Sequence, residues 1–285
     1  MPSLADSTAF RDDDRLLVQH QVALSILQGL VAGPVVKSLR WLDLGCGRGQ
    51  IIAALDKNLT AEARAKVSYL AYDVSQEFLR ETLRTATSLG LASVEAKVGD
   101  LDDFNRLVAA EETFDFITLT NTVHEVRPGA IAALLVDSLI RLTDHGCFFV
   151  YDMESLNPPE LGAVPWERDE FERILTTLTK TLGATQYRPQ IGQWKHKTCN
   201  GWSAQISRSH LLISPREISA RRELAIASVS ATIRDLLERK LERCRESLET
   251  LTRFGLETPS EESSKIHLLH TNWSVGRALE QVKKP

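Results

Sequence analysis

The residues of this chain best suited to bind a ligand are three glycines at alternate positions, Gly45, Gly47 and Gly49. They follow an apolar run, 38–44, that predicts a short buried strand, and they lead into apolar residues 51–55 that predict a helix. A glycine turn between a strand and a helix presents bare backbone N–H groups and a helix N-terminus to a ligand. A Cβ in such a turn would hold the ligand away from the backbone. The turn therefore predicts a binding site for a nucleotide-like cofactor.

Alternating strands and helices surround this turn and must position it. Further strands are predicted at 67–73, 94–98, 114–120 and 147–152, and helices at 49–57, 75–89, 102–110 and 129–143. Such βα repeats predict an α/β fold with a parallel sheet covered by helices. After a further predicted helix, 167–182, come two β-like segments, 185–196 and 202–213. Cys199-Asn200-Gly201 predicts the turn of an antiparallel hairpin between them, because Asn-Gly favours hairpin turns.

The C-terminal quarter has a different, helical pattern. Apolar residues at steps of three or four predict a long helix over Glu217–Arg253, and a polar spacer, 258–265, separates it from a last predicted helix, 266–282. We therefore expect a domain over 1–213, which includes an N-terminal helix at 15–31, and a helical extension over 214–285. The apolar stripe of 217–253 favours packing on the chain's own sheet domain. A homodimer or a contact with a partner chain is the alternative.

The spacing of the glycines distinguishes two classes of nucleotide-binding protein. A dinucleotide dehydrogenase has G-x-G-x-x-G, whereas this chain has G-x-G-x-G, with Gln50 in place of the last glycine. The segment Asp43-Leu-Gly-Cys-Gly-Arg-Gly49 resembles the first motif of the class I S-adenosylmethionine-dependent methyltransferases. The resemblance extends over about residues 12–213. It implies a doubly wound, mostly parallel seven-stranded sheet with a terminal antiparallel hairpin, and S-adenosylmethionine as the cofactor.

The same resemblance implies the cofactor-binding residues. Asp73 lies where the family holds the ribose hydroxyls, and Gly99-Asp100-Leu101 resembles the family's adenine contact. Carboxylates suit these roles because they accept strong hydrogen bonds from hydroxyl and amino groups, and Asp43 can orient the ammonium group of the methionine moiety. The competing interpretation of any one such aspartate is a turn or helix cap. The cofactor-binding residues expected on this basis are Asp43, Gly45, Gly47, Gly49, Asp73, Val74, Asp100, Leu101 and Asn121.

Proton-transferring side chains follow the fourth and fifth predicted strands. His124 and Glu125 come after the fourth strand, and Asp152 and Glu154 after the fifth. Histidine is the natural base near neutral pH, and Glu125 could act as the base or orient His124. We therefore expect His124 and Glu125 to be catalytic, and Asp152 and Glu154 are weaker candidates. The competing interpretation is that His124 caps the next helix or bonds the backbone.

The chain also indicates which methyl acceptors fit. The fourth strand is followed neither by an Asn-Pro-Pro-Tyr-like segment, which enzymes that methylate planar amino groups carry, nor by a Pro-Cys nucleophile for carbon methylation of cytosine. Oxygen, aliphatic nitrogen and ring nitrogen acceptors stay open. We expect a methyltransferase that acts on an oxygen or nitrogen of a small molecule.

Two other functions compete with a small-molecule methyltransferase. Residues 174–216 contain six basic and no acidic residues, so the 187–216 surface, with Tyr187, Trp194 and Trp202, could bind RNA or a protein. The interpretation we favour is an exposed basic face of an edge hairpin whose tryptophans fill the core side. A third hypothesis is that the chain is a catalytically silent scaffold subunit that binds the cofactor.

Composition predicts an ordinary soluble, cytoplasmic protein, with 43% apolar and 25% charged residues. No apolar run approaches the roughly 18 residues of a membrane span, so no membrane partner is expected. The four cysteines form no C-x-x-C pair, which favours a reducing compartment. His196 and Cys199 have the spacing of two metal ligands but lack a second pair, so no metal is expected.

Overall fold

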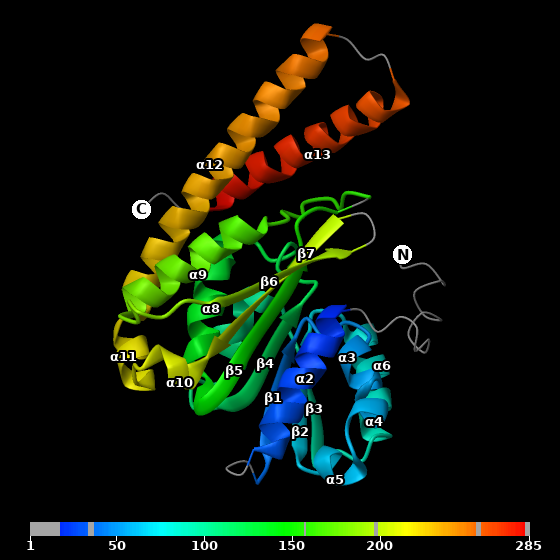
Figure 1. The fold of residues 1–285 in the computed structure, drawn as a ribbon, viewed down its shortest axis with the longest axis vertical. Helices are drawn as coiled ribbons and strands as arrows, with labels where there is room; N and C mark the ends of the chain where they lie inside the picture. Colours follow the sequence, from blue (N-terminus) through cyan, green and yellow to red (C-terminus); the bar gives the residue numbers. More distant parts are fainter. Residues whose placement is uncertain (1–17, 34–36, 157, 197–198, 255–257, 283–285) are drawn as a thin grey trace. The chain divides into compact units, whose positions relative to one another are not determined.

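The computed structural model describes residues 18–33, 37–156, 158–196, 199–254 and 258–282 (Figure 1). The strands are β1 (Leu39–Leu44), β2 (Val67–Asp73), β3 (Ser93–Val98), β4 (Phe114–Thr120), β5 (Leu142–Met153), β6 (Gln190–His196) and β7 (Cys199–Ser207). The α-helices are α2 (Val18–Ala32), α3 (Gln50–Ala53), α4 (Leu55–Asn58), α5 (Ala61–Arg64), α6 (Gln76–Thr87), α7 (Phe104–Leu107), α8 (Pro128–Ile140), α9 (Arg168–Leu182), α10 (Arg208–Leu211), α11 (Pro215–Ala220), α12 (Arg222–Phe254) and α13 (Pro259–Gln281). A 3-10 turn, η3 (Leu101–Asp103), precedes α7.

The strands form one seven-stranded sheet in the order β3-β2-β1-β4-β5-β7-β6. β1 pairs in parallel with both β2 and β4, and the β2–β3 and β4–β5 pairs are parallel as well. β7 and β6 add an antiparallel hairpin beside β5. The predicted fold class is therefore confirmed. The strand order reverses between β1 and β4, and ligands of doubly wound sheets bind at the carboxyl ends of the strands at such a point.

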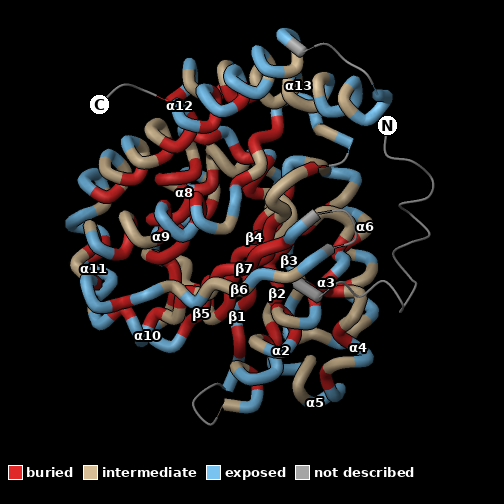
Figure 2. The backbone as a smooth tube through the Cα atoms, turned by 45° about the horizontal axis from the view of Figure 1, so that its top comes forward, coloured by how far each residue is buried: buried red, intermediate tan, exposed pale blue. Residues whose placement is uncertain are grey.

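The central strands are buried along almost their whole length, as the red segments of Figure 2 show. In β1 every residue except Arg40 is buried, and in β2 only Ser68 is partly exposed. Near-continuous apolar strands of this kind are typical of parallel sheets that helices cover on both faces. The ring of Trp41 packs edge-on against Tyr69, 4.7 Å between centroids, which joins β1 to β2 in the core.

The chain divides into two compact units. The first contains residues 1–120, 137–151 and 205–212, and the second contains 121–136, 152–204 and 213–285. The C-terminal helices therefore form a unit with the segments that follow β4 and β5. The division into a domain over 1–213 and a helical extension over 214–285 stays a prediction.

Within the second unit, the long helix α12 packs against α9 and pairs with α13 (Figure 1). The side chain of Glu170 on α9 is buried, and it forms ion pairs with Lys240 (2.8 Å) and Arg243 (3.1 Å) of α12. The apolar stripe predicted for 217–253 thus packs, at least in part, on a helix of the range 1–213. Thr232 of α12 adds a hydroxyl contact of 3.2 Å to Thr177 of α9.

Three predicted boundaries of the C-terminal half are wrong. The spacer predicted at 258–265 is helical, because Thr258 and Glu261 form a capping box that starts α13 at Pro259. Asn200 and Gly201 lie in β7, where the Asn200 carbonyl accepts from the Glu154 N–H, so the Asn-Gly pair does not form the hairpin turn. The residues between β6 and β7 lie outside the described ranges. β7 also ends at Ser207, and residues 208–211 form α10.

Two predicted helices of the N-terminal half are shorter than expected. The helix predicted at 49–57 is divided into α3 and α4 at Ala54, and the helix predicted at 102–110 consists of η3 and the single turn α7.

No helix in the described part of the chain is long and apolar enough to span a membrane.

Candidate functional site

The glycine turn after β1 has the backbone shape that its sequence predicts. Gly45, Gly47 and Gly49 have φ values of +62°, +53° and +78°, which side chains rarely adopt. A Cβ on Gly49 would lie 2.7 Å from Ile52 Cγ2 and 2.9 Å from Thr82 Oγ1. A Cβ on Gly47 would meet nothing within 4 Å. Packing therefore requires a glycine at 49, whereas the space beside Gly47 is free for a ligand.

Asp73 connects the end of β2 to the glycine turn. Its Oδ2 accepts the N–H of Gly47 at 2.8 Å, and its Oδ1 accepts the N–H of Ser75 at 2.8 Å. Because each carboxylate oxygen can accept a second hydrogen bond, Asp73 retains capacity for ribose hydroxyls. The structure brings together two of the residues predicted to bind the cofactor.

The end of β3 lies beside the end of β2. Gly99 donates its N–H to the carbonyl of Asp73 at 3.0 Å, and the hydroxyl of Tyr72 donates to the carbonyl of Asp100 at 2.7 Å. Asp100 is exposed and caps η3, accepting from the Asp102 N–H. Val74 is a large apolar side chain that is 70% exposed. An exposed carboxylate and an exposed apolar side chain at adjoining strand ends suit a flat base that carries an amino group.

Asp43 is buried under the turn in a hydrogen-bonded network. Its Oδ1 accepts from the hydroxyl of Thr118 at 2.7 Å, and its Oδ2 accepts from the hydroxyl of Tyr69 at 2.9 Å. The indole N–H of Trp41 donates to Thr118 Oγ1 at 2.8 Å. Burial raises the pKa of Asp43 to about 6, although the two hydroxyl hydrogen bonds lower it. Asp43 thus links β1, β2 and β4 through side-chain hydrogen bonds, and its predicted contact with an ammonium group stays a prediction.

Asn121 directly follows β4 and has a left-handed backbone with φ +53°. Asparagine tolerates this conformation better than other side chains, and non-glycine residues in this region often lie at functional sites. Its Oδ1 is buried and has no hydrogen-bond partner among the described residues.

His124, which lies in the loop after β4, is held by Asp152, which lies near the C-terminal end of β5. The two Asp152 carboxylate oxygens accept the backbone N–H of His124 at 2.8 Å and contact its Nδ1 at 2.7 Å. The backbone N–H of Met153 also donates to Asp152 Oδ1, at 2.7 Å. Both His124 and Asp152 are buried. Asp152 therefore contacts the imidazole more closely than Glu125 does, and a role of Glu125 in orienting His124 stays a prediction.

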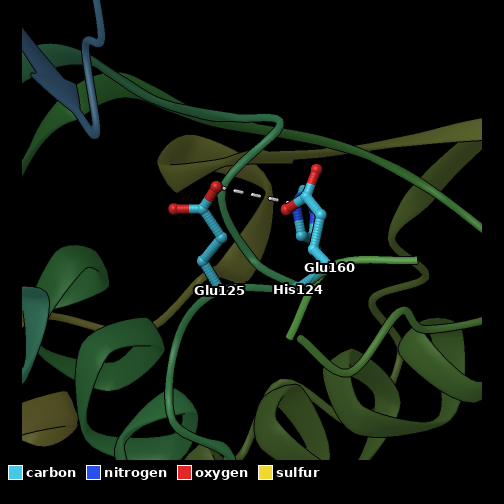
Figure 3. Close-up of side chains that lie close together, drawn as sticks. All are labelled: His124, Glu125 and Glu160. Carbon is cyan, nitrogen blue, oxygen red and sulfur yellow. Dashed lines mark ion pairs between the residues drawn. The ribbon is translucent and has the colours of Figure 1, made fainter. Parts of the chain in front are cut away.

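Two half-exposed carboxylates lie on the other side of the imidazole (Figure 3). His124 Nε2 is 3.5 Å from Glu160 Oε2 and 3.8 Å from Glu125 Oε1. Glu160 is a residue that the sequence did not indicate, because it lies in an irregular loop after Pro158-Pro159 with no periodic pattern around it. The N–H of Val164 donates to the carbonyl of His124 at 2.8 Å and holds this loop against His124.

These carboxylates shift the pKa of His124. Burial by itself would lower the pKa of the imidazole, but its interactions with Asp152 and Glu160 and the charge of Glu125 outweigh burial and raise this pKa to about 10. The interaction with His124 in turn lowers the pKa of Glu160.

Glu154 has a structural role. Its Oε1 accepts the backbone N–H of Arg168 at 3.1 Å and the side-chain amide of Gln193 at 2.8 Å.

The aromatic residues of the basic stretch are mostly inside the protein. Trp202 is fully buried, stacks on Phe171 at 4.3 Å between centroids, and donates its indole N–H to the carbonyl of Trp166 at 2.7 Å. Tyr187 is 9% exposed. Buried rings cannot stack on nucleic acid bases, so Trp202 and Tyr187 do not provide a stacking platform for RNA. The side chains of His196 and Cys199 lie outside the described part of the structure.

Comparisons with known proteins agree with this architecture. Residues 36–160 match the model of the family described as methyltransferase domain. Among solved structures, the CurJ carbon methyltransferase has 14% identity and a TM-score of 0.52, over 72% of this chain and 58% of that chain. Magnesium protoporphyrin IX methyltransferase (ChlM) from Synechocystis PCC 6803, with SAH bound, has 13% identity and a TM-score of 0.50, over 72% of this chain and 95% of that chain. No curated protein sequence matches the chain.

At these identities the solved structures show a shared fold, and the family match covers the segment from β1 to the loop after β5. The family match identifies residues 36–160 as a methyltransferase domain, and the strand order agrees with the fold that the resemblance to class I S-adenosylmethionine-dependent methyltransferases implies.

Proposed function

We propose that this chain binds S-adenosylmethionine at the carboxyl ends of β1, β2 and β3 and transfers its methyl group to an oxygen or nitrogen atom of a small molecule. The observation that carries the cofactor assignment is the contrast between Gly49, which packing requires, and Gly47, which faces open space with φ +53°. In a turn between a strand and a helix, a glycine whose added Cβ would meet no protein atom leaves room for a ligand to approach the backbone closely.

The residues around Gly47 fit the parts of this cofactor. Asp73 has the spare acceptor capacity for two ribose hydroxyls, and Asp100 and Val74 have the exposure that an adenine ring needs. Gly45, Leu101, Asn121 and Asp43 complete the proposed cofactor-binding set. The bound cofactor supplies an electrophilic methyl group on a sulfonium. The SAH-bound structure of ChlM, which shares this fold, supports the assignment.

His124 and Glu125 are the proposed catalytic residues on the acceptor side. Methyl transfer is an in-line displacement, so the protein must align the acceptor and take its proton if it carries one. His124 follows the end of β4 by four residues in the sequence. Asp152 positions the imidazole, and Glu125 contributes an exposed carboxylate beside Nε2.

A small-molecule acceptor is favoured over RNA or a protein, because Trp202 and Tyr187 are buried and cannot form a stacking platform. A cytoplasmic location is part of the same proposal. A homodimer or a partner chain bound through the exposed face of α12 is the second expectation for the C-terminal helices.

The experiment is transfer of radiolabelled methyl groups from S-adenosylmethionine into fractionated cell extract. We expect label in a small-molecule fraction with the wild-type chain and at least about 100-fold less with His124→Gln, as loss of a general acid–base group implies. The matched control is His145→Gln, which replaces an exposed histidine of β5. Ribonuclease- or protease-sensitive label would contradict the small-molecule acceptor. Cofactor binding without any transfer, in every fraction, would indicate a silent scaffold.

A further inference from the structure

Three side chains of types that can bind metal ions converge in the loops after β4 and β5. Nε2 of His124 and one carboxylate oxygen each of Glu125 and Glu160 all lie within 4.8 Å of one another (Figure 3). The imidazole of His124 is buried, with a relative exposure of 3%, and its Nε2 points at the two carboxylates. The carboxylates are about half exposed, so an ion can reach the cluster from solvent.

The distances within the cluster fit a shared ion better than direct hydrogen bonds. Charge-assisted hydrogen bonds between nitrogen and carboxylate oxygen are about 2.7–2.9 Å long. The 3.5 Å and 3.8 Å separations from Nε2 exceed this range, whereas Nδ1 of the same ring lies 2.7 Å from Asp152. Donor atoms that bind one tetrahedral ion at about 2.0–2.2 Å are about 3.4 Å apart. The two Nε2 separations are close to this value, and the three ligand atoms lie within 4.8 Å of one another, so one ion bound between them would draw the carboxylates closer together.

Asp152 contacts the other ring nitrogen of His124, Nδ1, as expected for a histidine that binds a metal. Histidines that bind metals almost always donate their other ring N–H to a carboxylate or carbonyl, which fixes the tautomer and the ring orientation. Asp152 is fully buried and held by the backbone N–H groups of His124 and Met153, so it can fill this role without moving. This arrangement leaves the lone pair of Nε2 directed at Glu125 and Glu160.

We propose that His124 Nε2, Glu125 and Glu160 bind one divalent transition-metal ion, for which Zn²⁺ is the best fit. One imidazole and two carboxylates suit Zn²⁺, and three protein ligands leave a position open. Mg²⁺ prefers octahedral oxygen ligands and fits this donor set less well.

The consequence for catalysis rests on the proposed function. In a methyltransferase, the open position would bind an acceptor oxygen, and a bound metal ion lowers the pKa of a coordinated hydroxyl or water. This favours hydroxyl compounds over amines as acceptors. Zn²⁺ binding itself requires neither cofactor nor acceptor.

The test is Zn²⁺ titration of the full chain after treatment with a chelator, by calorimetry without S-adenosylmethionine. We expect the wild type to bind one equivalent that Glu160→Gln weakens by at least about tenfold, as for loss of a group that supports a metal site. Glu172→Gln, an exposed glutamate of α9, is the matched control and should keep wild-type affinity. Zn²⁺ should also raise the Tm of the wild type and of Glu172→Gln more than that of Glu160→Gln.

Equal Zn²⁺ affinity of the wild type, Glu160→Gln and Glu125→Gln would overturn the proposed metal site, and so would the absence of Zn²⁺ binding to the folded wild type. Binding of S-adenosylmethionine is measured on the same samples. Cofactor binding without Zn²⁺ binding overturns only the metal site, whereas Zn²⁺ binding without cofactor binding overturns only the proposed function.

Discussion

The glycine turn and the His124 cluster are built in opposite ways. The turn consists of consecutive residues, and its properties depend on backbone: three positive φ values, the N–H of Gly47 bonded to Asp73, and a free space beside Gly47. The cluster consists of side chains from three separate segments, at 124–125, 152 and 160. A local backbone shape can serve the same cofactor in many proteins, whereas a cluster from separate loops can change with the acceptor. This difference explains why the methyl donor is evident from the sequence and the acceptor is not.

The comparison predicts that the cluster can be disabled without harm to cofactor binding. Asp152→Asn removes the carboxylate that holds the imidazole in one tautomer, and changes of this kind lower kcat by about 10³–10⁴-fold in enzymes that use a carboxylate–histidine pair. We expect kcat to fall about 10³-fold, with an unchanged Kd for S-adenosylmethionine measured by calorimetry.

Glu154→Gln is the matched control for Asp152→Asn, because Glu154 directly follows β5 and its side chain accepts hydrogen bonds from Arg168 and Gln193. It should change kcat by less than about threefold, as is usual away from the reacting groups. An equal loss in both variants, or a loss of cofactor affinity in Asp152→Asn, would contradict the separation of the two regions.

Within the turn, a substitution at Gly49 should act on the fold. A Cβ there would lie 2.7 Å from Ile52 and 2.9 Å from Thr82, on a backbone with φ +78°. We expect Gly49→Ala to lower the free energy of unfolding by roughly 2–5 kcal/mol, the sum of left-handed strain and overpacking. Urea unfolding measures this change, and a stability equal to that of the wild type would show that the turn relaxes more easily than its packing indicates.

We expect a smaller, pH-dependent effect on stability from Asp43, which lies beneath the turn. Its pKa is about 6 in the folded protein and 3.8 as the unperturbed value, so the folded state binds the proton more tightly. Asp43 therefore does not lower the free energy of unfolding below pH 4. Its ionisation lowers this free energy as the pH rises through 6, by on the order of 2–3 kcal/mol in total.

Asp43→Asn should remove this pH-dependent cost. We expect the variant to match the wild type near pH 4 and to gain stability over it as the pH rises to 7, measured by urea unfolding at each pH. A stability difference that does not vary with pH would show that the Asp43 carboxylate is not the titrating group.

The parts of the fold that follow from local pattern could be predicted from the sequence. The apolar runs of β1, β2 and β4 are buried strands because a parallel sheet buries both of its faces. The approach of Asp73 to Gly47 follows from the pairing of β1 with β2. The apolar pattern predicts the last helix only from residue 266, whereas α13 begins at Pro259, because its first turn depends on the Thr258–Glu261 capping box and contains no apolar stripe.

The His124 cluster could be predicted only in part. His124 and Glu125 are adjacent in sequence and follow a strand, so their position was evident. The pairing with Asp152 depends on how the loops after β4 and β5 fold, and Glu160 lies in an irregular loop where no periodicity exists to be read. Side chains that meet only through tertiary structure leave no spacing pattern in the chain.

The central claim, that the space beside Gly47 holds S-adenosylmethionine, is tested most directly by calorimetric titration of this cofactor into Gly47→Leu and Gly90→Leu. Gly90 is a matched control, because its φ is +69° and its Cβ would also meet nothing within 4 Å. Both variants bear similar backbone strain, but only the leucine at 47 would occupy the cofactor's space. We expect an affinity loss of at least about 100-fold for Gly47→Leu, equivalent to about 2.7 kcal/mol, and less than about threefold for Gly90→Leu. Wild-type affinity in Gly47→Leu would contradict the account.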